Sequence, residues 1–209
     1  LRVTDNNTVK VVEEVLANDI NAEIVKAIRD SGGKAIGLAG NKNKLLSATK
    51  LKIEVKDSDS NIEKLVDIGF VGRPTNVNID LIRNHIQEGK IPVIAPLGVD
   101  EENNSYNINA DTAAGFIAGK LQASKLLLLT DVSGVLDKDN NLISSLSLDH
   151  AINIIDEKFI IGGMKPKILT CVEAMKNGVN KSTILDGRIP HSVVLELFTE
   201  HGIGTQIYS

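Results

Sequence analysis

The chain has 209 residues, of which 42% are hydrophobic and 24% are charged, and its formal net charge is −4. This composition is typical of a folded globular protein with a substantial core, and it argues against intrinsic disorder. The negative charge and the even spread of Lys and Arg argue against non-specific binding to nucleic acid or an anionic membrane. No apolar run approaches the roughly 20 residues of a membrane span, and the first residues show no secretory or transit pattern. We therefore expect a soluble, cytoplasmic protein whose partners are small molecules.

Apolar runs alternate with helical patterns from one end of the chain to the other. This alternation predicts an α/β fold with a largely parallel sheet, organised as a single domain. The continuous apolar run Lys125–Thr130 is typical of a central parallel strand. In chain order, the patterns predict helices at about 5–17 and 20–31, a strand at 34–38, a hairpin that starts at 45–55 and turns through 56–60, a helix at 78–88, a strand at 91–97, a helix at 111–121, the strand at 125–130, a helix at 168–176, a strand at 182–186 and a helix at 190–199.

Two lysines follow a glycine pair in the segment Gly162–Lys167, just ahead of a helical pattern that begins near Ile168. Glycines let backbone N–H groups approach an anion, a helix N-terminus favours negative charge, and a lysine adds a full positive charge. The segment fits neither the Walker loop nor the dinucleotide-binding fingerprint. A pair of solvated lysines is the simpler alternative, so the segment alone leaves phosphate binding open.

Two further segments rich in polar side chains lie where predicted elements meet. Asn107, Asn109 and Asp111 precede an apolar helix, where they could bind a polar substrate or where Asn109 or Asp111 could simply cap the helix. Residues 130–135 follow the strand at 125–130, where open α/β sheets bind ligands, although a plain strand-to-loop exit would explain them equally well. Arg2, taken alone, is best explained as an ordinary surface charge.

Metal and nucleophile chemistry find little support in the sequence. The four histidines show no metal-ligand spacing, and Cys171 is the one cysteine. Because Cys171 lies in a helical apolar pattern, we expect a buried thiol rather than a nucleophile. No serine lies in a Gly-x-Ser-x-Gly elbow, which argues against hydrolase chemistry of that kind.

Taken together and in this order, the polar segments resemble the amino-acid kinase family, and within it the kinases of N-acetylglutamate. The resemblance covers practically the whole chain, and the combination is much more specific than any single segment. The matching segments are residues 1–5, 67–72, 107–111, 129–137, 162–167, 186–191 and 202–205.

The resemblance implies a three-layer αβα sandwich around a mostly parallel sheet, with an amino-acid substrate lobe at about 1–110 and an ATP-binding lobe at about 111–209. It implies transfer of the γ-phosphoryl group of ATP, with Mg²⁺, to the side-chain carboxylate of N-acetyl-L-glutamate in arginine biosynthesis. Lys167 corresponds to the family's transition-state lysine and Asp111 to its organising aspartate, and both suit the charge of a metaphosphate-like transition state. The positions that correspond to substrate-binding residues are Arg2, Asn107 and Asn109. Those that correspond to ATP-binding residues are Asp131, Val132, Ser133, Gly134, Val135, Leu136, Phe159, Ile160 and Ile161.

The chain departs from the family pattern in two respects. The family's N-terminal portion, with a first strand whose lysine-and-glycine loop contacts the phosphates and a second glycine-rich loop that holds the substrate, has no counterpart in these 209 residues. We therefore expect the 209 residues alone to lack a strand of the sheet, to be catalytically crippled and to be unstable, and we favour a fragmentary sequence of an active enzyme. Lys165 stands where relatives usually carry an apolar residue, and we expect it to face solvent rather than to bind phosphate.

The ending of the chain, residues 190–205, resembles that of arginine-inhibited members of the family. It implies feedback inhibition by arginine, with Glu200 as the guanidinium partner and His191 and Gly202 as further candidates. The resemblance also implies a homodimer, a hexamer in the full-length protein, and a PII-type signalling protein as a partner. Two alternatives stay open: another kinase of the family, acting on carbamate or aspartate, and a non-catalytic fragment that senses arginine or binds a partner.

Overall fold

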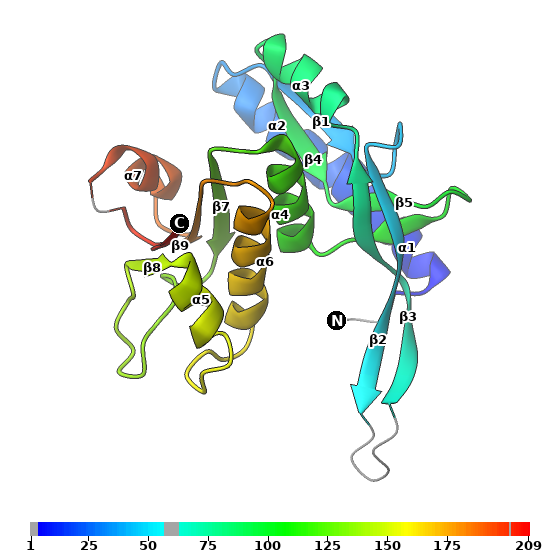
Figure 1. Ribbon diagram of the computed structural model, residues 1–209. Helices are drawn as coiled ribbons and strands as arrows, with labels where there is room; N and C mark the ends of the chain where they lie inside the picture. Colours follow the sequence, from blue (N-terminus) through cyan, green and yellow to red (C-terminus); the bar gives the residue numbers. More distant parts are fainter. Residues whose placement is uncertain (1–3, 57–62, 201) are drawn as a thin grey trace. The chain divides into compact units, whose positions relative to one another are not determined.

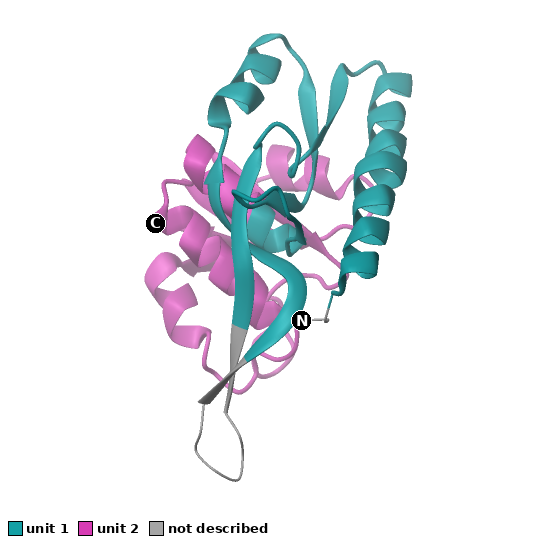
Figure 2. Ribbon diagram, turned by 90° about the vertical axis from the view of Figure 1, so that its right-hand side faces the viewer, with its two compact units in different colours: residues 1–113 teal, residues 114–209 magenta. Residues whose placement is uncertain are grey.

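The computed structural model describes residues 4–56, 63–200 and 202–209. The chain divides into two compact units, residues 1–113 and 114–209, coloured teal and magenta in Figure 2. Helices alternate with strands in both units, and parallel strand pairs occur in both, so the predicted α/β class is confirmed. The described strands form three separate sheets, each within a single unit, rather than one continuous sheet.

The first unit begins with a continuous helical run. Asp5 caps helix α1 (Asn6–Glu13) by accepting a hydrogen bond of 2.7 Å from the Thr8 N–H. The run continues without a break through η1 (Glu14–Ile20), a π-helix, into α2 (Asn21–Asp30). The expected gap between two helices near residues 17–20 is therefore wrong. No glycine or proline lies between α1 and α2, so nothing in the backbone interrupts the helix.

The first unit also contains a two-stranded parallel sheet of β1 (Ala35–Ala39) and β4 (Ile91–Ala95). Its register runs from the pair Ala35 and Ile91 to the pair Ala39 and Ala95. Helix α2 packs on both strands, and α3 (Ile79–Gln87) packs on β4. Asn78 caps α3 by accepting from the Leu81 N–H at 3.1 Å.

The remaining strands of the first unit close into a small barrel. Its long hairpin, β2 (Leu46–Lys56) and β3 (Glu63–Val77), is joined by the short strands β5 (Leu97–Val99) and β6 (Ser105–Asn107) (Figure 1). The hairpin was predicted, and most of its predicted turn lies outside the described residues. The single strand predicted at 91–97 is split at Pro96, because β4 pairs with β1 whereas β5 pairs with β2 and β6 in the barrel.

Helix α4 (Ala110–Leu121) begins in the first unit and ends in the second. The sheet of the second unit has the order β7-β9-β10-β8, with β7 (Lys125–Thr130) parallel to β9 (Lys181–Asp186), β10 (Thr205–Tyr208) antiparallel to β9, and β8 (Ser145–Ser147) parallel to β10. Among the described strands, β7 lies at an edge of this sheet rather than at its predicted central position, and Leu129 is 48% exposed.

Two helices bury the core of the second unit. Helices α5 (Leu148–Ile154) and α6 (Met164–Lys176) pack together, and α6 also packs on β7 and β9. Cys171 on α6 is completely buried, as predicted, beside core residues such as Ile168, Val172 and Ile184. The last helix is α7 (Ser192–Phe198).

The sequence patterns missed helix α5 and the strands β6, β8 and β10, all of which are short. No helix within the described part of the chain is both long enough and apolar enough to cross a membrane.

Candidate functional site

The glycine-lysine segment forms the N-terminus of α6. The helix begins at Met164, one turn earlier than predicted, so Lys165, Pro166 and Lys167 all lie in its first turn. The missing N–H of Pro166 costs nothing there, because first-turn N–H groups have no partner within the helix. Gly162 has φ +59°, a conformation that favours glycine. A Cβ at Gly162 or Gly163 would meet no atom within 4 Å, so the backbone ahead of the helix is open to a ligand.

The two lysines of this first turn differ in their surroundings. Lys165 is exposed, and its Nζ lies 2.6 Å from Asp156 Oδ1. This geometry agrees with the expectation that Lys165 faces solvent. Lys167 is half-buried at the start of the face that packs on the core. The segment thus presents two chemically similar residues in unlike environments, one on the surface and one partly withdrawn from water.

Just before α6, the predicted ATP-binding residues Phe159, Ile160 and Ile161 point in different directions. Ile160 is 9% exposed and belongs to the core, and Phe159 packs against that core. Ile161 is 75% exposed. A ligand at this segment would therefore meet the Ile161 side chain and the backbone.

The other predicted ATP-binding segment leaves the carboxyl end of β7. Asp131 and Val132 are exposed and Ser133 is half-buried. Gly134 has φ +148°, and a Cβ there would lie 2.6 Å from Thr205 Oγ1. The Val135 N–H donates to the same Oγ1 at 2.8 Å, and the Val135 side chain is completely buried. The segment is thus anchored at Val135, with Leu136 half-buried beyond it, while its first residues are open.

The predicted substrate residues of the first unit lie around the start of α4. Asn107 ends β6, is half-buried, and pairs with Leu97 and Val71 through the backbone. Asn109 Oδ1 accepts from the N–H of Thr112 at 3.0 Å and from its hydroxyl at 3.2 Å, so the capping interpretation of Asn109 is confirmed. Asp111 is half-buried in the first turn of α4.

Arg2 lies outside the described residues. Two residues later the chain is fixed to β3: the Thr4 N–H donates to the Ile68 carbonyl at 2.9 Å, and the Phe70 N–H donates to the Thr4 carbonyl at 2.6 Å. Gly69 sits between these bonds with φ +79°, and a Cβ there would lie 2.0 Å from the Thr4 carbonyl oxygen. Only glycine allows so close an approach of the two backbones.

A model of the amino acid kinase family matches residues 1–186, which include both predicted ATP-binding segments, the α6 N-terminus and the asparagines near α4. The chain belongs to the amino acid kinase family.

Within this family the chain is similar to acetylglutamate kinases. It is 53% identical to the acetylglutamate kinase of Rhodospirillum centenum over 207 residues, which are 99% of this chain and 68% of that protein. It is 54% identical to that of Brucella anthropi over 99% of this chain and 70% of that protein.

Solved structures show the same fold. The N-acetylglutamate synthase of Neisseria gonorrhoeae, complexed with coenzyme A and N-acetyl-glutamate, matches with a TM-score of 0.83 and 27% identity. The match covers 100% of this chain and 45% of the synthase chain. The same synthase complexed with coenzyme A and L-arginine matches with a TM-score of 0.76 and 26% identity over 100% of this chain and 47% of that one.

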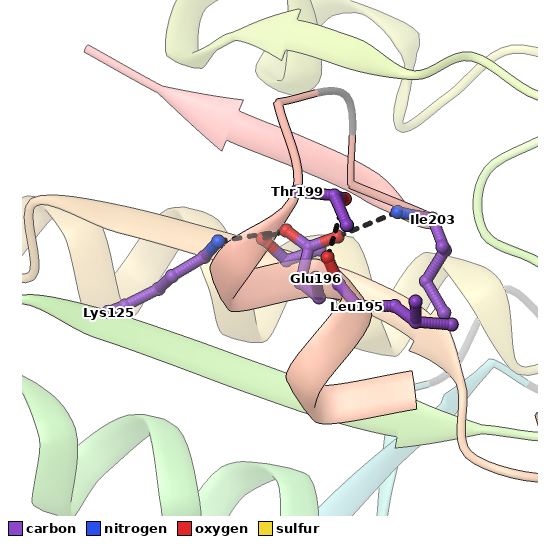
Figure 3. A network of polar contacts seen from close by, with 6 residues as sticks. Lys125, Leu195, Glu196, Thr199 and Ile203 are labelled. Carbon is purple, nitrogen blue, oxygen red and sulfur yellow. Dashed lines mark hydrogen bonds and ion pairs between the residues drawn. The ribbon is translucent and has the colours of Figure 1, made fainter. Parts of the chain in front are cut away.

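The second unit of this amino acid kinase contains a buried carboxylate that the sequence did not reveal. Glu196 on α7 is 6% exposed, and its Oε1 lies 2.8 Å from Lys125 Nζ (Figure 3). Glu196 also accepts from the Thr183 hydroxyl at 3.1 Å and from the Ile203 N–H at 3.0 Å. Burial alone would raise the pKa of Glu196, but these hydrogen bonds outweigh it and hold the pKa below its ordinary value of 4.5. A glutamate within an apolar helical pattern was the one available signal.

The three residues predicted to bind arginine lie before and after α7 along the chain. Glu200 is exposed after α7, and His191 precedes that helix with φ +60°. Gly202 also has φ +60°, and a Cβ there would lie 2.5 Å from Glu196 Oε2. The Gly202 backbone therefore lies against the buried carboxylate.

A second unpredicted feature is the pair of Asp186 and Arg188 at the carboxyl end of β9. Asp186 is 8% exposed and accepts from Arg188 Nε at 3.0 Å, from Nη2 at 2.7 Å and from the Arg188 N–H at 2.9 Å. The Arg188 side chain lowers the pKa of Asp186 to about 2. The pair is fully charged at neutral pH.

We expect Glu196→Gln to destabilise the protein by about 1–3 kcal/mol at pH 7, because Lys125 and the Ile203 N–H would lose a charged acceptor. A carboxylate with a lowered pKa contributes stability above its unfolded pKa and loses it as the pH falls through the folded value. The difference from the natural protein should therefore shrink below about pH 4.5. Urea unfolding at pH 7 and at about pH 4 measures both values.

Glu200→Gln is the matched control, since it removes an exposed carboxylate four residues away and should change stability little. A Glu196→Gln deficit that stays constant between the two pH values would contradict the role of the ionised carboxylate.

Proposed function

We propose that this protein transfers the γ-phosphoryl group of ATP to the side-chain carboxylate of N-acetyl-L-glutamate, as an acetylglutamate kinase of arginine biosynthesis. The observation that carries the proposal is identity of about half the residues to acetylglutamate kinases over 99% of the chain. The product is an acyl phosphate. Because the attacking carboxylate is ionised at neutral pH, the reaction needs no general base.

The N-terminus of α6 suits the transferred phosphoryl group. A metaphosphate-like transition state spreads negative charge over its equatorial oxygens, so catalysis depends on positioned positive charge. We propose that Lys167 supplies this charge, with the Lys165 N–H of the first turn of α6 beside it, since Pro166 has no N–H and the Met164 N–H donates to the Ile161 carbonyl at 3.3 Å. Asp111 is proposed to organise the cations around the reacting group. Mg²⁺ is proposed to enter with ATP, coordinated by the phosphates, because Mg²⁺ is usually bound through substrate phosphates and a few carboxylates.

Different residues are proposed to hold the two substrates. Arg2 and Asn107 suit the carboxylates and amide of N-acetyl-L-glutamate, since a guanidinium and an amide N–H₂ are hydrogen-bond donors. The amide oxygen of Asn109 accepts the capping hydrogen bond of α4, and its N–H₂ group is proposed to donate to the substrate. For ATP, the open residues of the β7 exit (Asp131, Val132 and Ser133) offer side chains, whereas Val135 and Ile160 offer only backbone. We also propose a cytoplasmic location, since a single buried cysteine suits a reducing compartment.

Arginine is proposed as an inhibitor that binds around α7. A structural neighbour of 26% identity is described in complex with L-arginine, which supports an arginine site in this fold. Glu200 is the carboxylate that the sequence predicts as the partner of the arginine guanidinium. The geometry adds Glu196 beside the Gly202 backbone as a second candidate, where a guanidinium would have to replace Lys125 or the Ile203 N–H as its partner. The hexamer and a PII-type partner stay predictions of the sequence.

A homodimer is proposed through the outer face of the helical run α1-η1-α2. Val11, Val15, Ile20 and Ile24 are between 38% and 61% exposed. In a regular α-helix, the five-residue step from Val15 to Ile20 would correspond to about 1.4 turns, so Ile20 and Ile24 would not lie in line with Val11 and Val15. The wider turn of η1, with its i→i+5 hydrogen bonds, brings Ile20 and Ile24 back towards the line of Val11 and Val15. The π-helix thus supports one continuous apolar row.

Lys167→Ala should lower kcat for ADP formation at least ~100-fold while changing KM for ATP little, because its charge acts mainly in the transition state. The assay uses the protein as its gene encodes it, with ATP, Mg²⁺ and N-acetyl-L-glutamate. Lys165→Ala is the matched control two residues away and should stay close to the natural rate. A pure KM effect for Lys167→Ala would contradict its role, and ADP formation with carbamate or L-aspartate in place of N-acetyl-L-glutamate would support the rival kinases.

L-Arginine should inhibit this reaction, and Glu200→Gln or Glu196→Gln should raise the half-inhibitory concentration about tenfold or more, because each removes a candidate partner of the guanidinium. Inhibition curves of the two variants identify the carboxylate used. Unchanged curves for both variants would exclude both. Calorimetry that detects arginine binding but no ATP binding would instead favour the arginine-sensing alternative.

Ile24→Glu should convert the dimer to a monomer, because it places a charge in the apolar row. Sedimentation velocity measures the change. Ile86→Glu on α3, also at an exposed isoleucine, is the matched control and should leave the dimer intact. A natural protein that sediments as a monomer, or an Ile24→Glu variant that stays dimeric, would refute the proposed interface.

A further inference from the structure

The Asp186–Arg188 pair lies at the same edge of the sheet as the predicted ATP-binding exit of β7. Strands β7 and β9 are parallel, and Thr130 pairs with Asp186 at their last rung. The Gly187 N–H then donates to the Thr130 carbonyl at 2.9 Å, which extends the pairing by one more bond. Asp131 and Arg188 therefore leave neighbouring strands at the carboxyl edge, where open α/β sheets bind their ligands.

Asp186 holds the Arg188 guanidinium in one orientation. A guanidinium has five N–H donors, and Asp186 uses the Nε donor and one of those on Nη2. The remaining donors are open, since the Arg188 side chain is 68% exposed. Because the conformational freedom of the side chain is already restricted, less entropy is lost when a ligand binds.

The carboxylates at this edge of the sheet would repel an anionic ligand such as a polyphosphate unless a positive charge lies beside them. Asp131 and Asp186 both bear carboxylates here, and both raise the pKa of Arg188, the first cause being its hydrogen bond to Asp186. Without Arg188, a polyphosphate would face two negative charges and no positive one from this group. A planar guanidinium matches two phosphate oxygens at once, which an ammonium group does not.

We propose that Arg188 binds a phosphate group of ATP, and that Asp186 is its positioning residue. The inference rests on the proposed kinase function and assigns a role to the segment at 186–188, which the proposed mechanism does not use. The competing explanation is that the pair only fixes the chain as it leaves β9 towards α7. The two explanations differ in one respect: only phosphate binding makes the effect of Arg188 depend on the phosphates of the ligand.

Calorimetric titration with ATP and with adenosine separates them. Arg188→Gln should weaken ATP binding about tenfold or more and change adenosine binding less than about twofold. Arg188→Lys, which keeps the charge but loses the planar fork, should recover part of the ATP affinity. Asp186→Asn should weaken ATP binding to an intermediate degree, because the guanidinium is no longer held. Arg83→Gln on α3 removes the same charge from an exposed position and should bind ATP normally.

Two results for Arg188→Gln would overturn the inference: an equal loss of affinity for ATP and adenosine, or unchanged ATP binding together with a lower melting temperature. Either result would mean that the pair only stabilises the fold. If Arg188→Gln does not fold, the same comparison applies to Arg188→Lys, which must then weaken ATP more than adenosine. A natural protein that binds neither ligand would refute the kinase function itself. A natural protein that binds both, with an Arg188→Gln variant that does the same, would refute only the role of Arg188.

Discussion

The parallel pairing of β7 with β9 is the interaction on which the second unit depends. Its register, from Lys125 with Lys181 to Thr130 with Asp186, aligns two separate groups of polar residues. Towards one end, Lys125 and Thr183 meet the buried carboxylate of Glu196. At the other end, Asp131 and Arg188 emerge together. A shift of the register by one residue would turn each side chain of β9 to the opposite face and would disrupt both groups at once.

Local sequence patterns predicted most of the helices and strands, because apolar periodicity and caps such as Asp5 and Asn78 act over a few residues. The errors arose where a tertiary partner decides the outcome. The break at Pro96 depends on which sheet accepts the next strand, and the edge position of β7 depends on the pairing of distant strands. The π-helix differs from an α-helix by a change of hydrogen-bonding partner that composition does not mark.

The candidate site divides in the same way. The roles of Lys167, Asn107 and the β7 exit are predictions from the sequence, made because each lies at the end of an element and belongs to a recognisable segment. Glu196 and Arg188 could not, because each is a single charged residue whose importance comes from a partner far away or from the sheet edge beside it. Glu196 in particular lies in a helix that reads as apolar, and its charge is explained by hydrogen bonds from other elements, among them the one from Lys125, 71 residues earlier.

The π-helix η1 holds one more residue than an α-helix with the same number of turns would hold. About five residues of this wide turn advance as far around the helix axis as about four residues of an α-helix, so the extra residue leaves the direction in which α2 faces unchanged. The buried face of α2, with Asn21 and Val25, therefore still packs on β1 and β4. Removing one residue between Val15 and Ile20 would let the run continue as a regular α-helix and would keep that face on its sheet. An alignment gap of one residue at this point would therefore mark the loss of the wide turn rather than a change in how the helix packs on its sheet.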